Sequence, residues 1–161
     1  MILVTLGTQD KQFDRLLIKL EELKVNEIIQ DEIVVQAGHT IFRSDNMDIF
    51  DFIPFDKFNE LVSTCDILVT HGGVGSIVQG LKSNKKIIAV PRLKEYGEHT
   101  NNHQIEIIRK YDELGYIIGN SNLDELGNDI IRVKTFKPNK FKSNNKNFIH
   151  KLDEEISTLL K

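Results

Sequence analysis

Short apolar runs alternate with segments of helical periodicity along most of the chain, and this alternation restricts the fold more than any other feature. The runs expected to form strands are residues 2–6, 33–36, 49–53, 67–70, 87–90 and 116–118. Apolar residues between them recur at helical spacing, as Leu16, Leu20 and Leu23 do before the second run. The pattern predicts an α/β fold: a Rossmann-like, doubly wound, mostly parallel six-stranded sheet.

The composition narrows the class of protein. The chain has 161 residues, of which 40% are hydrophobic, enough for one domain with its own core. No apolar stretch approaches the roughly 20 residues of a membrane-spanning helix, and the apolar start stops at Gly7 without a preceding basic segment, so we expect a strand there rather than a signal peptide. A formal net charge of −3 argues against a nucleic-acid-binding surface. The single cysteine, Cys65, is interpreted as a core residue and suits a reducing compartment.

Three segments are expected along the chain. Residues 1–133 form the domain, and within it Asn122 is a plausible cap for a later helix. Residues 134–146, rich in lysine and asparagine, form a polar connection. Residues 147–161 are predicted to form a helix whose apolar face packs on the domain or on another chain.

A glycine-rich segment, 71–76 with the sequence His-Gly-Gly-Val-Gly-Ser, stands between the fourth predicted strand and a helical pattern. A helix that starts there points unpaired backbone N–H groups and a partial positive charge toward whatever lies beyond the strands. Ser76 adds a hydroxyl donor, and His71 offers a ring N–H. The segment is typical of a site for a diphosphate, and the alternative is a tight turn without a ligand.

Two well-known phosphate-binding patterns do not fit. The dinucleotide fingerprint requires G-x-G-x-x-G after the first strand, where this chain has a single glycine, Gly7. The P-loop pattern G-x-x-x-x-G-K-[ST] does not occur either. We therefore expect neither a dehydrogenase nor an ATPase of those kinds.

Further polar groups follow other strand ends, where doubly wound sheets bind ligands. Gly7 and Thr8 follow the first strand, and an uninterrupted polar stretch at 98–104 follows the fifth. Several oriented donors and acceptors of this kind suit sugar hydroxyls better than a helix cap requires.

These motifs together resemble the donor-binding, C-terminal half of GT-B glycosyltransferases of family 28. The resemblance rests on residues 69–76, 90–92 and 97–104 and on the opening 4–9 with 13–16, and it covers about residues 1–133. It is closest to the single-domain, PssE-type subunits of bacterial exopolysaccharide and capsule synthesis. These are similar to the catalytic subunit of the two-subunit eukaryotic enzyme that adds the second GlcNAc to a dolichol-linked sugar.

The resemblance implies a UDP-sugar donor bound without a metal ion or another cofactor. His71 and Glu98 would be catalytic, with His71 stabilising the charge that grows on the leaving phosphate. Gln79 would contact the ribose, and Glu98 with His99 the sugar. The donor-binding residues that it implies are Gly7, Thr8, Gly72, Gly73, Gly75, Ser76, Gln79, Glu98, His99, Asn102 and Gln104.

The resemblance also implies an inverting hexosyltransferase that is active with a membrane-anchored, PssD-type subunit. That partner would bind the acceptor, a lipid-linked saccharide, and would hold this chain at the cytoplasmic face of the membrane. The alternative is a subunit that binds a nucleotide sugar, or enhances another transferase, without catalysis.

Overall fold

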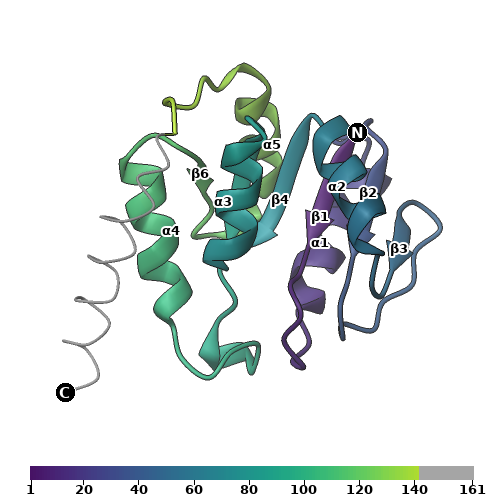
Figure 1. Ribbon diagram of the computed structural model, residues 1–161. Helices are drawn as coiled ribbons and strands as arrows, with labels where there is room; N and C mark the ends of the chain where they lie inside the picture. The colour runs from purple at the N-terminus through teal and green to yellow at the C-terminus, as the bar shows by residue number, and fades with distance from the viewer. Residues whose placement is uncertain (142–161) are drawn as a thin grey trace.

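Six parallel strands form the centre of the computed structural model, which describes residues 1–141 (Figure 1). The strands are β1 Ile2–Thr5, β2 Ile33–Gln36, β3 Asp48–Phe50, β4 Ile67–His71, β5 Lys86–Val90 and β6 Ile118–Gly119. Their order across the sheet is β3-β2-β1-β4-β5-β6, and every neighbouring pair is parallel. The order reverses between β1 and β4, and doubly wound sheets bind ligands beyond the carboxyl ends of the strands at such a point.

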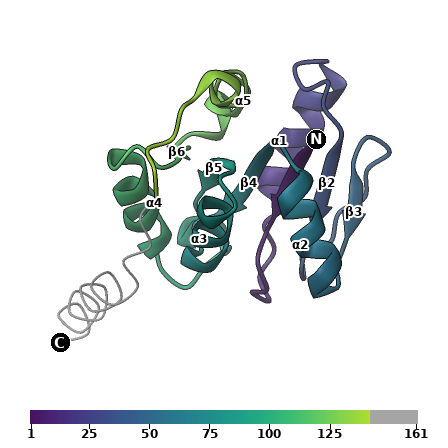
Figure 2. The same ribbon diagram turned by 45° about the horizontal axis from the view of Figure 1, so that its top comes forward.

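Helices cover both faces of the sheet (Figure 2). They are α1 Asp14–Val25, α2 Phe55–Thr64, α3 Val74–Lys82, α4 His103–Glu113 and α5 Leu126–Thr135, with short 3₁₀ turns η1 Lys94–Tyr96 and η2 Leu123–Glu125. The first and last helices pack on one face, and the other three pack on the opposite face. This is the Rossmann-like, doubly wound arrangement that the sequence predicts.

Alternating strand residues build the two cores. Ile2 and Val4 of β1 contact the leucines of α1, whereas Leu3 between them faces α3 and its neighbours. Because β4 and β1 are covered on both sides, their residues read as continuous apolar runs. Cys65, predicted to be a core residue, is buried at the end of α2.

All six predicted strands are present. Three of them differ from the predicted bounds by a single residue, and the third and sixth differ by more. The third ends at Phe50 because the amide of Ile53 donates to the side chain of Gln36 instead of continuing the ladder. The sixth starts only at Ile118, since the chain first closes the end of α4 through a hydrogen bond from Tyr116 N to Tyr111 O.

The chain after the last strand stays close to the domain. α5 extends to Thr135, Phe136 packs against the core, and Asn139 N donates to Gly115 O at 2.8 Å. The remainder of the predicted polar connection and the predicted helix at 147–161 lie outside the described residues. Within residues 1–141, no helix combines the length and the apolar character needed to cross a bilayer.

Candidate functional site

Three loops meet beyond the carboxyl ends of the central strands (Figure 1). They are the β1–α1 loop (residues 6–13), the glycine turn that leads from β4 into α3 (71–76), and the β5–α4 loop (91–102). The sequence predicts ligand-binding residues in each of them. The topology brings all three loops to one edge of the sheet, as the prediction requires.

The N-terminus of α3 is open. Gly73 is its N-cap residue and no side chain caps the helix. The first helical hydrogen bond runs from Ile77 N to Gly73 O, and the amides of Val74, Gly75 and Ser76 have no acceptor within residues 1–141. Three amide donors and the positive end of the helix dipole are therefore available to an anion.

The glycines of this turn serve different purposes. A Cβ at Gly72 would lie 2.6 Å from Cβ of Gln104, and a Cβ at Gly73 would overlap with the ring of His71. A Cβ at Gly75 would meet nothing within 4 Å. The first two glycines are thus required by packing within the protein, and only Gly75 borders open space, where a ligand could approach the backbone.

His71 ends β4 and lies between two glycines. A Cβ at Gly7, which has a positive φ of 78°, would lie 2.6 Å from Cε1 of the ring, and Gly73 closes the other side. Nδ1 lies 3.4 Å from the carbonyl oxygen of Thr5. The imidazole therefore lies tightly packed where the strand order reverses between β1 and β4, beside the open N-terminus of α3.

The surroundings of His71 keep it neutral in the free protein. Burial lowers its pKa to about 4, and the charges of Arg92 and His99 act in the same direction. The Thr5 carbonyl opposes this shift. At neutral pH the ring is an uncharged imidazole, with one nitrogen protonated and one not.

Arg92 joins the two outer loops. Its side chain is fully buried, and its guanidinium lies 4.9 Å from the ring centroid of Phe13. It donates to backbone carbonyl oxygens of Leu6, Lys11, Gln12 and Glu98. One side chain thus donates to four backbone carbonyls, which fixes the β1–α1 loop against the β5–α4 loop.

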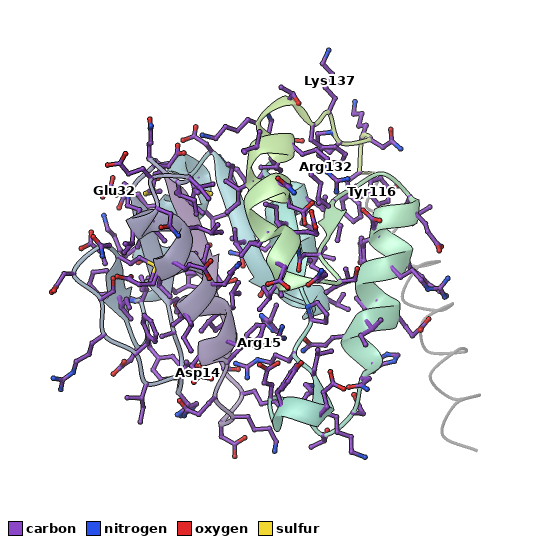
Figure 3. All side chains as sticks on the ribbon, turned by 180° about the vertical axis from the view of Figure 1, so that it is seen from behind. Asp14, Arg15, Glu32, Tyr116, Arg132 and Lys137 are labelled. Carbon is purple, nitrogen blue, oxygen red and sulfur yellow. The ribbon has the colours of Figure 1, made fainter. Side chains whose placement is uncertain are left out.

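Glu98 belongs to the same network. Its carboxylate is 3% exposed and pairs with Arg15, through Nε at 2.8 Å and a second nitrogen at 2.9 Å (Figure 3 shows Arg15 at the start of α1, next to Asp14). The second oxygen also accepts from Leu93 N at 2.9 Å. Since both oxygens accept hydrogen bonds within the protein, Glu98 holds the β5–α4 loop in place, and the catalytic sugar contact that the resemblance implied stays a prediction.

Gln104 also holds the loops in place. Its carbonyl oxygen accepts from Gly72 N at 3.1 Å and from Arg92 N at 2.9 Å. One side chain thereby connects the glycine turn to the β5–α4 loop. The amide of Gly72 is thereby closed by the protein, and the predicted contact of Gln104 with the sugar donor stays a prediction.

The other predicted residues lie around the open helix end. Ser76 is half-buried in the first turn of α3, and Thr8 is exposed on the β1–α1 loop. The amide nitrogen of Gln79 donates to Asn59 Oδ1 at 2.9 Å, which ties its side chain to α2. His99 accepts from Asn101 N through Nδ1 at 3.2 Å.

A cleft of about 480 Å³ lies beside these loops, between α4 and β6. Asn102 lines it, with Oδ1 accepting from Lys94 N at 2.9 Å. Leu93 and Ile105 supply apolar walls, and Arg109 and Ser121 supply polar groups. Within residues 1–141, His, Cys, Asp and Glu side chains do not gather in groups of three that could hold a metal ion.

Two residues of the network, Arg15 and Arg92, are not among the predicted site residues. Arg92 follows a proline and a strand that is buried from Ile87 to Val90. A charged side chain in such a position must be paired or exposed, and this signal could have identified it.

A comparison with the sequence models of protein families shows the family of this chain. Residues 1–159 match the sequence model of the glycosyltransferase family 28 C-terminal domain. The chain belongs to this family. The fold expected of a family 28 C-terminal domain is therefore the fold observed.

Related proteins carry a common name. The UDP-N-acetylglucosamine transferase subunit ALG13 of Candida glabrata is 30% identical over 122 residues, which cover 71% of this chain and 57% of that protein. Its counterpart in Candida albicans is 28% identical over 101 residues, covering 63% and 31%. The family 28 chain thus spans between about a third and just over half of these relatives.

Solved structures share the fold. The solution NMR structure of ALG13 superposes with a TM-score of 0.62 at 20% identity, over 91% of this chain and 92% of that chain. The glycotransferase of kitacinnamycin gives a TM-score of 0.59 at 19% identity, over 83% of this chain and 34% of the other. At these identities the likeness concerns the fold alone.

Proposed function

We propose that this family 28 chain is the donor-binding, catalytic subunit of a UDP-sugar-dependent glycosyltransferase. The observation that carries the proposal is the open N-terminus of α3, with unpartnered amides from Val74 to Ser76, next to His71 at the switch point. The relatives named as UDP-N-acetylglucosamine transferase subunits support UDP-GlcNAc as the first donor to test.

The chemistry of the site suits a departing nucleotide diphosphate. When the bond between the sugar and the β-phosphate breaks, negative charge grows on the phosphate oxygens. Oriented amides at a helix N-terminus stabilise the transition state, in which this charge has grown, more than they stabilise the bound donor before transfer. This difference accelerates transfer. We infer an inverting hexosyl transfer. The amides, Ser76 and His71 stabilise the negative charge on the leaving phosphate, as a metal ion does in other transferases.

The surrounding residues extend the proposal to the rest of the donor. Gln79, one turn beyond Ser76, lies where its carbonyl oxygen could accept from a ribose hydroxyl. His99 and Asn102, on the β5–α4 loop, are the remaining candidates for contacts with the sugar. Their positions depend on Arg15, Glu98 and Arg92, which hold that loop.

The proposal includes a partner. We infer that a membrane-associated, PssD-type subunit binds a lipid-linked saccharide, supplies the base that deprotonates its hydroxyl, and holds this chain at the cytoplasmic face of the membrane during exopolysaccharide synthesis. The relatives that are named as subunits support a shared active site.

Calorimetric titration of UDP and of ADP into the purified chain tests the donor site. We expect UDP to bind, and to bind more tightly than ADP. Failure to bind UDP, or a preference for ADP, would contradict the proposal.

Co-production with the product of the neighbouring gene, followed by a transfer assay with UDP-GlcNAc, tests the partner. A subunit that only enhances another transferase would tolerate the loss of His71 without a change in turnover. A catalytic donor subunit would not.

A further inference from the structure

We propose that His71 takes up one proton from the solvent when a nucleotide diphosphate binds at the N-terminus of α3. The diphosphate then faces an imidazolium, although the free protein holds a neutral ring. This inference rests on the proposed function and adds a specific protonation step to it.

The argument begins with the Nδ1 atom. It lies 3.4 Å from the carbonyl oxygen of Thr5, and a carbonyl oxygen can only accept a hydrogen bond. Of the two neutral tautomers, the one with the proton on Nδ1 is therefore favoured, because the other would turn a lone pair toward the carbonyl. Gly7 and Gly73 flank the ring so closely that a Cβ at either position would overlap with it.

The Nε2 atom of this tautomer carries no proton. It lies between Gly7 and Gly73, the N-cap residue of α3, where the unpartnered amides begin. An ionised phosphate oxygen is also only an acceptor. A neutral His71 would thus turn a lone pair toward the phosphate, and the ring N–H expected from the sequence becomes available only after a second proton is bound.

The charges around the ring explain why His71 is protonated only when the ligand binds. Besides the Thr5 carbonyl, the groups that act on His71 are Arg92 and His99 of the β5–α4 loop, and both oppose a further positive charge. The carboxylate of Glu98 is committed to Arg15. With burial, these effects hold the pKa of the free ring near 4. A diphosphate brings the missing negative charge, and this raises the pKa of His71.

The sign of the pH dependence follows from linkage. The complex binds one proton more than the free protein between a pH of about 4 and the pKa of His71 in the complex. Within this range the donor affinity rises about tenfold for each unit by which the pH falls. During transfer the electron pair of the broken bond stays on the phosphate oxygen, the proton stays on Nε2, and their attraction strengthens as the charge grows.

Calorimetry with UDP-GlcNAc measures the proton directly. This probe is chosen because its diphosphate, a diester, does not titrate near neutral pH, so any proton taken up binds to the protein. Titrations at about pH 6 in two non-phosphate buffers of different ionisation enthalpy should give an uptake close to one proton. His71→Gln, which places a neutral N–H donor near the Nε2 position, should bind with an uptake close to zero, and the surface variant His39→Gln should match the parent.

The outcomes separate the inference from the proposed function. Binding without proton uptake, or an uptake that persists in His71→Gln, would overturn the inference and leave the donor site intact. No binding in either buffer would overturn the proposed function, and the inference with it.

Long-range ¹H–¹⁵N spectra of the imidazole of His71 give a second readout that needs no variant. We expect the Nδ1-protonated tautomer in the free protein and a doubly protonated ring after saturation with UDP-GlcNAc. A free ring protonated on Nε2, or a neutral ring in the complex, would contradict the proposal.

Discussion

Two helical segments begin at the same edge of the sheet, and the protein closes only one of them. The turn η2, which leads into α5, starts at Asn122, whose side chain accepts from Asp124 N at 3.1 Å. α3 starts at Gly73 and has no side-chain cap. A cap is worth about 1 kcal/mol, so the open end is a cost to stability.

The difference has a structural cause. A capping residue needs a side chain, and a Cβ at Gly73 would overlap with the ring of His71. The chain can therefore have a capped α3 or a histidine beside its N-terminus, but not both. This comparison indicates that the start of η2 is closed by a side chain of the protein, whereas the start of α3 is left open to a ligand.

Removing the ring should have the largest effect. In the reconstituted pair of subunits, His71→Ala should lower turnover with UDP-GlcNAc by about 10- to 1,000-fold, as loss of an oxyanion donor does. His39→Ala, at an exposed histidine on another loop, is the matched control and should keep full turnover. Equal rates for the two variants would remove His71 from the mechanism.

The second-largest effect is expected from adding a side chain to the glycine turn. Gly73→Ala forces the imidazole aside, and overpacking of this kind lowers the stability of a protein by about 1–3 kcal/mol. Because the displaced ring no longer lies beside the open amides, we also expect the affinity for UDP to fall roughly 10- to 100-fold. Calorimetry with UDP should show this loss. Gly75→Ala, where a Cβ meets nothing within 4 Å, should leave the free protein as stable as the parent in urea denaturation. A Gly73→Ala protein that binds UDP normally would contradict the packing argument.

Breaking the ion pair between Arg15 and Glu98 should lower the stability of the protein more than it changes the recognition of the donor. Glu98→Gln leaves the half-buried Arg15 without its charge partner, and we expect a loss of about 1–3 kcal/mol in the free energy of unfolding. The ratio of the affinities for UDP and UDP-GlcNAc should not change, since both carboxylate oxygens already accept hydrogen bonds within the protein. A selective loss of UDP-GlcNAc affinity would restore Glu98 to a sugar contact.

Opening the capped end should have the smallest effect. Asn122→Ala removes the acceptor for Asp124 N and should destabilise the protein by about 1 kcal/mol. Urea denaturation measures this loss, and UDP affinity should stay at the parent value. A fall in affinity would show that the two helix ends are not independent.

The fold could be predicted from the sequence because its signals are local. β-Branched runs alternate with helical periodicity, and this is enough to indicate six parallel strands and helices on both faces. The end of β3 and the start of β6 were misplaced, because Gln36 and Tyr111 supply hydrogen-bond acceptors from elsewhere in the fold.

The candidate site could be predicted only in part. The helix start after β4 is a local signal, so the glycine turn and His71 were identified. The roles of Glu98 and Gln104 depend on partners that the sequence does not place: Arg15 is 83 residues from Glu98, and Gly72 is 32 residues from Gln104. A polar side chain in a loop gives no sign of whether it faces a ligand or another loop.

The most direct test follows the backbone amides of both helix ends in ¹H–¹⁵N spectra during a titration with UDP-GlcNAc. The account predicts that Val74, Gly75 and Ser76 show the largest shifts, while Asp124, whose amide is already bonded, does not move. A spectrum in which the amides of α3 stay in place at saturation would contradict the claim that this helix end binds the diphosphate.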